Sequence, residues 1–312
     1  MSSSTEKVTA MRIKTSIIIP TKNGADNIGE CLQSVFEQDF EEGFEVLVID
    51  SGSTDSTSNI AQRFPIKLFQ IKPEDFHHSV TRSYGVELAQ GEYVVFLSQD
   101  ATPLDNLWLR KITDNFKDPN VVGVSGRQVP RGDAAPMERH WLSYFYPSDK
   151  RIVSLPGKSS NVREEYYYFF SDVNSSMRKE ILKEHKFPEN IIMAEDKAWC
   201  RKVLLNGYTV VYEPEAIVCH SHHYSLKRAF QNSFSGGMAY AQFCERSEKF
   251  QLLLFIKQGL HYFFCEMRFL ATAGNIRYIP YAVVYDIMKY IGRFLGRQYD
   301  YLPHFLKVRF SQ

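Results

Sequence analysis

Two short acidic segments contain the residues best suited to chemistry. Asp100 follows an apolar run at residues 93–97, and Glu195 and Asp196 stand together where a helical pattern begins. A carboxylate just beyond a buried strand is a hard oxygen ligand for Mg²⁺ or Mn²⁺. A carboxylate that opens a helix can serve as a general base for a hydroxyl within hydrogen-bond distance. Together the two segments favour a metal-assisted enzyme.

Each acidic segment also has a structural explanation. The Thr-Pro that follows Asp100 is typical of a turn at a strand end. Acidic residues in the first turn of a helix interact favourably with the helix dipole, which accounts for most pairs such as Glu195 and Asp196. The spacing of these residues alone therefore does not decide between the two explanations.

Three further residues are candidates for binding. Asp50 ends a second apolar run, where a carboxylate can accept hydrogen bonds from a base or a ribose, or can stabilise a turn. Arg82 near a helix start can bind a diphosphate through two parallel hydrogen bonds, or can be an ordinary surface residue. His220 lies in the cluster at residues 220–223, and one histidine that completes a carboxylate-bound metal is favoured over a zinc site.

The elements that must position these residues follow from the periodicity. Apolar runs alternate with helical patterns from residue 15 to residue 129. The runs at residues 16–19, 44–49, 66–70, 93–97 and 121–125 predict strands. This alternation predicts an α/β fold with a doubly wound, mostly parallel sheet flanked by helices. Ligands of such sheets bind beyond the carboxyl ends of the strands, where Asp50 and Asp100 fall.

The remaining chain is less regular. Residues 130–165 are rich in Pro, Gly, Ser and charge, which predicts a long functional loop. A helix is expected from about residue 194, with Trp199 on it, and the acceptor is expected to contact this loop and helix. Residues 226–312 predict a helical C-terminal region, and residues 1–13 a disordered N-terminus.

Composition limits the classes of protein and partner. The 312 residues carry a net charge of +1, so nothing points to a nucleic acid. Five cysteines without CxxC spacing and a polar N-terminus predict a cytoplasmic protein. No apolar run reaches the roughly 18–20 residues of a membrane span. Residues 276–312 hold six Lys and Arg against two Asp among many aromatic residues, which suits a membrane surface, an oligomer contact or packing on the sheet.

The motifs together resemble those of the family 2 glycosyltransferases of the GT-A fold, and within it the bacterial rhamnosyltransferase-like branch. The resemblance spans residues 14–225, which we take as the catalytic domain. It rests on IIPTKNG at 18–24, VIDSGSTD at 48–55, TRSYG at 81–85, GEYVVFLSQDA at 91–101, AED at 194–196 and HSH at 220–222.

This resemblance implies an inverting sugar transfer from a nucleotide-activated donor. Asp196 would be the general base, with Glu195 orienting it or contacting the acceptor, and Asp100 and His220 would hold Mg²⁺ or Mn²⁺. Gln99 stands where many relatives carry an acid. The residues implied to bind the nucleotide sugar are Pro20, Thr21, Asn23, Asp50, Arg82 and Gln99.

The implied donor is dTDP-rhamnose, and the implied acceptor is a growing, lipid-linked surface glycan such as an O-antigen. A lipid-linked acceptor would place the enzyme on the cytoplasmic face of the inner membrane. Two alternatives stay open on the sequence: the same fold using UDP-galactofuranose or a UDP-hexose, and a catalytically inactive scaffold that binds nucleotide sugars.

Overall fold

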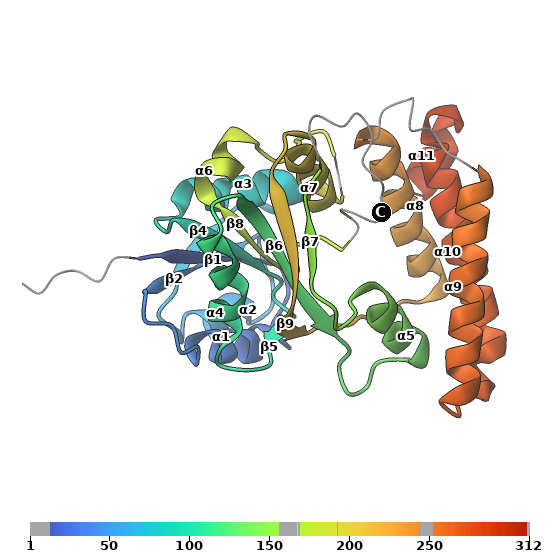
Figure 1. Cartoon of the computed structure of the whole chain (residues 1–312), viewed down its shortest axis with the longest axis horizontal. Helices are drawn as coiled ribbons and strands as arrows, with labels where there is room; N and C mark the ends of the chain where they lie inside the picture. The colour runs from blue at the N-terminus through green and yellow to red at the C-terminus, as the bar shows by residue number, and fades with distance from the viewer. Residues whose placement is uncertain (1–12, 156–166, 168, 192, 244–251, 311–312) are drawn as a thin grey trace, which may run out of the picture.

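Nine strands form one mixed sheet with helices on both faces, and a layer of long helices stands beside it in the computed structural model (Figure 1). The structure describes residues 13–155, 167, 169–191, 193–243 and 252–310. Most of the segment that was expected to be a disordered N-terminus lies outside these residues. The strands are β1 (Thr15–Thr21), β2 (Phe44–Asp50), β3 (Lys67–Gln70), β4 (Tyr93–Leu97), β5 (Thr102–Pro103), β6 (Val121–Val129), β7 (Arg151–Val153), β8 (Asn174–Arg178) and β9 (Thr209–Cys219).

The sheet has a parallel half and a mixed half. Its order is β3-β2-β1-β4-β8-β6-β9-β5, with β7 paired to β9. The first four strands are parallel, as expected for strands joined by helical crossovers. β8 then runs antiparallel to both β4 and β6, while β6 and β9 are parallel to each other. The doubly wound α/β fold is therefore confirmed, with a sheet that is more mixed than the sequence suggested.

The direction of β8 has a consequence for the active site. The carboxyl ends of β1, β2, β4, β6 and β9 all lie at one edge of the sheet. Because β8 is antiparallel and its Asn174 pairs with Leu97, it begins at this same edge. The residues that precede β8 therefore join those that follow the other strands.

Helices cover the two faces of the sheet through two hydrophobic clusters. Alternate residues of β1 face opposite sides: Ile18 packs with α3 (His78–Leu88), α6 (Lys179–Glu184) and α7 (Glu195–Leu205), and Ile17 packs with α1 (Ile28–Phe36) and α4 (Trp108–Thr113). Strands buried on both faces read as continuous apolar runs, which is why β1, β2 and β4 were easy to predict. The remaining element on this part of the chain is the short α2 (Thr57–Ala61), with the 3₁₀ turns η1 (Pro73–Asp75) and η2 (Asp114–Lys117).

Residues 130–165 are not a plain loop. They contain α5 (Pro136–Phe145), which has Pro in its first turn, and the short β7. The interpretation of this segment as one long loop was therefore wrong for its described part, because Pro at a helix start favours the helix rather than breaking it.

The C-terminal region is helical, as expected. It consists of α8 (Leu226–Phe243), α9 (Leu252–Thr272), η5 (Ile276–Tyr278), α10 (Ile279–Arg297), η6 (Tyr299–Tyr301) and α11 (His304–Phe310). Helices α8 and α10 can cross closely because Gly296 has no Cβ. A Cβ at this position would overlap the carbonyl oxygen of Phe234. Among the described residues no helix combines the length and the apolar character needed to span a bilayer. Whether residue 225 is a domain boundary remains a prediction.

Candidate active site

The loops after β1 and β2 are joined to each other by hydrogen bonds. Asn23, which has φ +47°, accepts a bond from the backbone of Thr54 at 2.9 Å, and its own N–H donates to Ser53 Oγ at 2.9 Å. Two residues further along the chain, the backbone N–H of Ala25 donates to Asp55 Oδ2 at 3.2 Å. The two loops therefore form one fixed surface at the carboxyl edge of the sheet, which we call the paired loops (residues 21–25 and 51–57).

Asp50, at the end of β2, stabilises the second of the paired loops through hydrogen bonds. Its side chain is buried and accepts hydrogen bonds from the backbone and hydroxyl of Ser53 and, at 3.0 Å, from Ser58 Oγ. The structural explanation offered by the sequence, a stabilised turn, therefore accounts for these contacts of the carboxylate. Its role in binding a nucleotide stays a prediction.

Gln99 ties β4 to the first of the paired loops. Its Oε1 accepts from the backbone of Lys22 at 3.0 Å, and its Nε2 donates to the carbonyl of the same residue at 3.1 Å. Thr21 Oγ1 also donates to Gln99 Oε1, and Pro20 lies just before it in β1. Only an amide can donate and accept in this way, which gives a physical reason for Gln at this position.

Asp100, His220 and His222 form a candidate metal centre. Their ligand atoms all lie within 4.8 Å of one another. The Asp100 carboxylate oxygens are 3.6 Å from His220 Nε2 and 3.7 Å from His222 Nδ1. Arg131 donates to the Asp100 carbonyl at 2.8 Å, which holds the end of the strand in place.

The donor set fits a divalent metal. His220 is buried, and its Nδ1 lies 3.0 Å from Gln128 Oε1. With this oxygen as the acceptor, the ring carries its proton on Nδ1, and the lone pair of Nε2 is directed toward Asp100. Burial also lowers the pKa of His220 to about 4, which keeps the ring neutral and able to ligate at physiological pH. The Asp100 carboxylate supplies a hard oxygen ligand and the two imidazoles supply neutral nitrogen ligands, a set that can hold a divalent metal ion.

Asp196 is held in position at the start of α7. Its Oδ2 accepts a bond from the backbone of Asp172 at 3.1 Å, and its Oδ1 accepts one from the backbone of Lys197 at 2.7 Å. The residue is 9% exposed, so a face of it remains accessible. A carboxylate with a fixed position and partial access has the properties of a general base.

Arg82 lies among three carboxylates. Its Nη1 donates to Glu195 at 2.5 Å, and its Nε is 3.3 Å from Asp172 Oδ2. Burial raises the pKa of Asp172 to about 8 and raises that of Glu195, while Arg82 acts in the opposite direction on both. Lys197, whose Nζ is 3.8 Å from Asp196 Oδ1, is a second cation at this cluster. With its pKa raised to about 8, the buried Asp172 holds its proton near neutral pH.

The backbone just before these acids adopts an uncommon conformation. Ala194 has φ +65° and ψ +31°, the left-handed region that L-residues with a side chain rarely occupy. Such conformations cost free energy and persist where surrounding contacts impose them, often at functional sites. The turn at Ala194 directs both Glu195 and Asp196 from the first turn of α7 toward Arg82 and Asp172.

The structure brings most of the sequence-predicted residues to one edge and adds three that were missed. Pro20, Thr21, Asn23, Asp50 and Gln99 belong to the paired loops and their supports, and the other predicted residues form the metal and acid clusters. The missed residues are Asp172, Gln128 and His222. Only His222 had a signal in the sequence, because it belongs to the histidine cluster at residues 220–223. From this cluster, His220 alone was predicted to be a metal ligand. Trp199 is fully buried, so its ring does not face the site, and contact of the acceptor with the helix that carries it stays a prediction.

Comparisons with known proteins identify the family of the chain. The sequence model described as Glycosyl transferase family 2 matches residues 16–186. The chain is 30% identical to the O-antigen chain rhamnosyltransferase WbaN of Salmonella anatum, covering 92% of this chain and 90% of WbaN. It is 31% identical to the O-antigen chain rhamnosyltransferase RfbN of Salmonella typhimurium, covering 93% and 92%.

The fold has counterparts among solved structures. The mannosyltransferase PcManGT from Pyrobaculum calidifontis, in complex with GDP-Man and Mn²⁺, superposes with a TM-score of 0.63 at 19% identity, covering 93% of this chain and 88% of that one. This likeness shows a GT-A fold. Together with the family match over more than half of the sequence, it shows that the chain belongs to the family 2 glycosyltransferases.

Proposed function

We propose that this enzyme transfers L-rhamnose from dTDP-rhamnose to a hydroxyl group of a growing O-antigen-type polysaccharide, with inversion at the anomeric carbon. The observation that supports this choice most strongly is the identity of 30–31% to two O-antigen chain rhamnosyltransferases, over at least nine tenths of each chain. The candidate metal centre and the positioned Asp196 supply the chemistry that such a transfer needs.

In the proposed reaction Asp196 accepts the proton of the acceptor hydroxyl. The hydroxyl oxygen then forms a bond to the anomeric carbon as the bond from that carbon to the diphosphate breaks, and dTDP leaves with the electron pair. Glu195, which is paired with Arg82 and is adjacent to Asp196 in the chain, would orient Asp196 or contact the acceptor. Arg82 itself faces the acids, which supports a role in positioning Glu195, and its expected contact with the diphosphate stays a prediction.

Asp100, His220 and His222 would hold the metal. When bound there, Mn²⁺ or Mg²⁺ supplies positive charge that stabilises the diphosphate leaving group. His220 contributes a neutral imidazole whose orientation is set by Gln128. The paired loops, with Pro20, Thr21, Asn23 and Asp50, would bind the nucleotide on the neighbouring strands, and Gln99 would hold the loop between the nucleotide and the metal.

A panel of donors tests this function. Release of the nucleoside diphosphate would be measured for dTDP-rhamnose, UDP-glucose, UDP-galactofuranose and GDP-mannose, with and without Mn²⁺. We expect turnover of dTDP-rhamnose in the presence of Mn²⁺. Turnover of a UDP-sugar instead would replace the donor and keep the reaction class. Binding of a donor without turnover of any would leave the inactive scaffold, and absence of both binding and turnover with every donor would reject the transferase.

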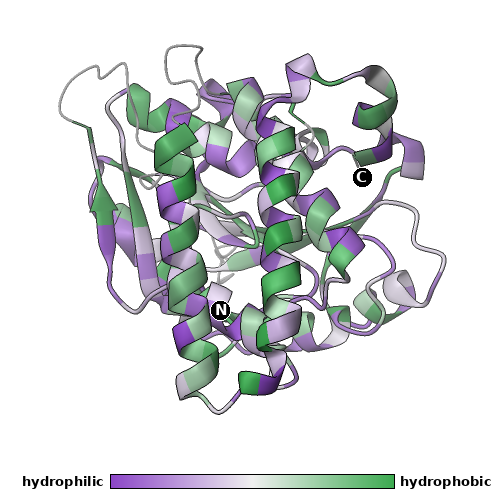
Figure 2. Ribbon diagram, turned by 90° about the vertical axis from the view of Figure 1, so that its right-hand side faces the viewer, coloured by the Kyte–Doolittle hydropathy of each residue, from purple (hydrophilic) through white to green (hydrophobic). Residues whose placement is uncertain are grey.

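We further propose that the enzyme works in the cytoplasm at an anionic membrane surface, through α9 and α10. These helices expose Leu253, Leu260, Phe264, Val284, Ile287 and Ile291, which we call the C-terminal apolar face. Figure 2 looks toward this side, where hydrophobic turns alternate with polar ones along the two long helices in front. Exposed apolar residues gathered on one side of a protein are typical of an interaction surface.

Charge favours a bilayer over a second copy of the chain. Between residues 252 and 297, all of which the structure describes, the two acids Glu266 and Asp286 are buried, and the exposed Lys257, Arg268 and Arg277 are basic. Two copies that met through this face would bring like charges together. An anionic lipid surface complements both the apolar and the basic residues.

A further inference from the structure

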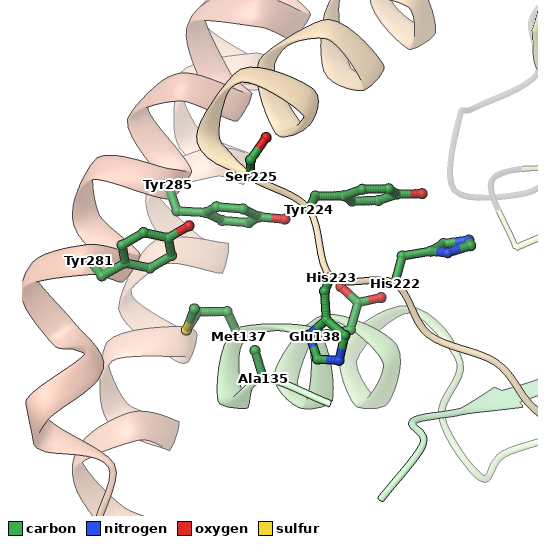
Figure 3. A pocket seen from close by; sticks show the side chains of 9 residues that line it. All are labelled: Ala135, Met137, Glu138, His222, His223, Tyr224, Ser225, Tyr281 and Tyr285. Atoms are coloured by element: carbon green, nitrogen blue, oxygen red, sulfur yellow. The ribbon is translucent and has the colours of Figure 1, made fainter. Parts of the chain in front are cut away.

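A cavity of about 290 Å³ lies between α5, the segment at residues 222–225 and α10. Figure 3 shows Tyr281 and Tyr285 extending from α10 toward that segment, with Met137 and Glu138 on α5 beside them. The lining consists of Ala135, Met137, Glu138, His222, His223, Tyr224, Ser225, Tyr281 and Tyr285.

The chemistry of the lining favours a neutral ligand rich in hydroxyl groups. Three tyrosines offer flat apolar rings with a polar edge, and Tyr281 and Tyr285 are stacked at 6.0 Å between centroids. The one carboxylate in the lining is Glu138, and the lining contains neither lysine nor arginine. Lys289, 5.3 Å from the Tyr285 ring, offsets the charge of Glu138, so the cavity has no excess positive charge to attract a phosphate. A hydroxyl group of a ligand can donate to Glu138.

The cavity adjoins the candidate metal centre. His222 lines it, and the Nδ1 atom of the same ring is 3.7 Å from Asp100 Oδ2. The His222 ring also stacks on Tyr224 at 5.1 Å, and the backbone of His222 is hydrogen-bonded to Glu138. A ligand in the cavity would therefore lie beside the centre at which the donor is expected to react.

Size and position in the sequence point in the same direction. The volume is at the small end of the range of ligand pockets, roughly 300–1,000 Å³, which suits one sugar ring better than a nucleotide sugar. The residues from segment 222–225 and α10 lie beyond residues 16–186, the part that matches the family. This is the expected place for a feature that differs between enzymes of one family, such as the acceptor.

We propose that this cavity is a subsite for a sugar ring of the acceptor glycan, an inference that rests on the proposed transferase function. The apolar C–H face of the ring packs against Tyr281 and Tyr285, and Glu138 accepts a hydrogen bond from one of its hydroxyl groups. Tyr281 is 42% exposed, so it is open to the solvent from which a ligand would enter. The subsite would therefore bind one sugar ring of the acceptor next to the reaction centre.

Ligand-detected saturation-transfer NMR tests the subsite with three neutral probes: methyl α-L-rhamnoside, methyl α-D-mannoside and methyl β-D-galactoside. We expect at least one probe to bind the full-length protein whether or not dTDP is present. Tyr281→Ala and Glu138→Gln are expected to weaken this binding on the order of tenfold, because each removes one contact to the ring. Tyr301→Ala is the matched control, since Tyr301 is a 76% exposed tyrosine outside the lining.

Three outcomes would overturn the inference: no probe binds the wild type, dTDP displaces the probe, or both cavity variants bind it as the control does. Thermal melting of each variant shows whether a loss of binding reflects unfolding. Failure of the subsite is distinguishable from failure of the proposed function. A wild type that turns over dTDP-rhamnose without binding probes here rejects only the subsite, whereas probe binding without turnover of any donor rejects the transferase.

Discussion

Asp196 is the residue on which the proposed chemistry depends most. Asparagine has the same shape but cannot accept a proton, so Asp196→Asn is expected to lower the transfer rate by roughly 10²-fold or more. Nucleotide binding should persist, which a thermal shift with dTDP would measure. Asp114→Asn, an exposed acid away from the site, serves as the control. A variant at position 196 with nearly normal transfer would instead assign the base to a neighbour such as Glu195.

Gln128 sets the ring orientation of His220 and thereby the affinity for metal. Loss of such a partner typically costs about 10–100-fold in metal binding, and we expect Gln128→Leu to weaken Mn²⁺ binding by this amount. Gln128→Glu keeps an acceptor for the imidazole N–H and should retain the affinity. Calorimetric titration with Mn²⁺ would compare them. Equal affinities for the Leu and Glu variants would show that this hydrogen bond does not matter.

At the residue scale the sequence predicted the features that depend on local order. Asp100 and Asp50 could be found because each comes directly after an apolar run that had to be a buried strand. Asp172 and Gln128 could not, since each matters only through a partner far away in the chain: Arg82 for Asp172 and His220 for Gln128. No local pattern encodes contacts between segments that only the folded sheet brings together.

The start of α7 shows strain at the element scale. A left-handed residue with a Cβ costs about 1–2 kcal/mol, and glycine avoids this cost. Ala194→Gly is expected to keep or raise the melting temperature with activity retained, and Ala194→Val to lower the melting temperature because a β-branched residue tolerates φ +65° poorly. Thermal unfolding of both variants would check this. An Ala194→Val variant as stable as the wild type would contradict the left-handed backbone conformation of Ala194.

Helices α9 and α10 meet at a buried acid that makes stability depend on pH. Burial, together with a hydrogen bond to Asp286, raises the pKa of Glu266 to about 9. Because the unfolded chain releases this proton at much lower pH, the folded state binds more protons between about pH 4.5 and 9, and stability falls as pH rises across this window. Glu266→Gln should flatten this decline. Melting temperatures between pH 5 and 10 would show it, and parallel curves for both proteins would refute it.

Elements were predicted well where burial made their pattern simple. The parallel strands β1, β2 and β4 contain continuous apolar runs because both of their faces are covered. By contrast, α5 and β7 lie in a segment whose Pro and charged residues resemble a loop. The direction of β8 also escaped prediction. Strand direction depends on how the chain returns to the sheet, and residue types do not record it.

For the whole molecule, membrane attachment is the property to test. Full-length protein should float with phosphatidylcholine vesicles only when they contain phosphatidylglycerol, and less so at high salt. Each basic residue near such a surface contributes about 1 kcal/mol, so the double variant Lys257→Glu, Arg268→Glu should bind on the order of tenfold more weakly or worse. Phe264→Ser should also weaken binding.

The control is Ile152→Ser, which changes an exposed apolar residue on β7, away from the C-terminal apolar face. Binding to neutral vesicles that salt does not affect would contradict the electrostatic part of the proposal. Dimerisation that the Phe264 variant abolishes would assign the face to a second copy of the chain instead.

The hydrogen bonds between the paired loops have a consequence for the order of events in catalysis. Because Asn23, Ser53 and Asp55 already join these loops in the free protein, an arriving donor does not have to order them. The entropy that a flexible binding loop would lose on association is then largely spared, and the contacts of the nucleotide contribute to its affinity almost in full. The paired loops are thus ordered before a donor arrives and not in response to it.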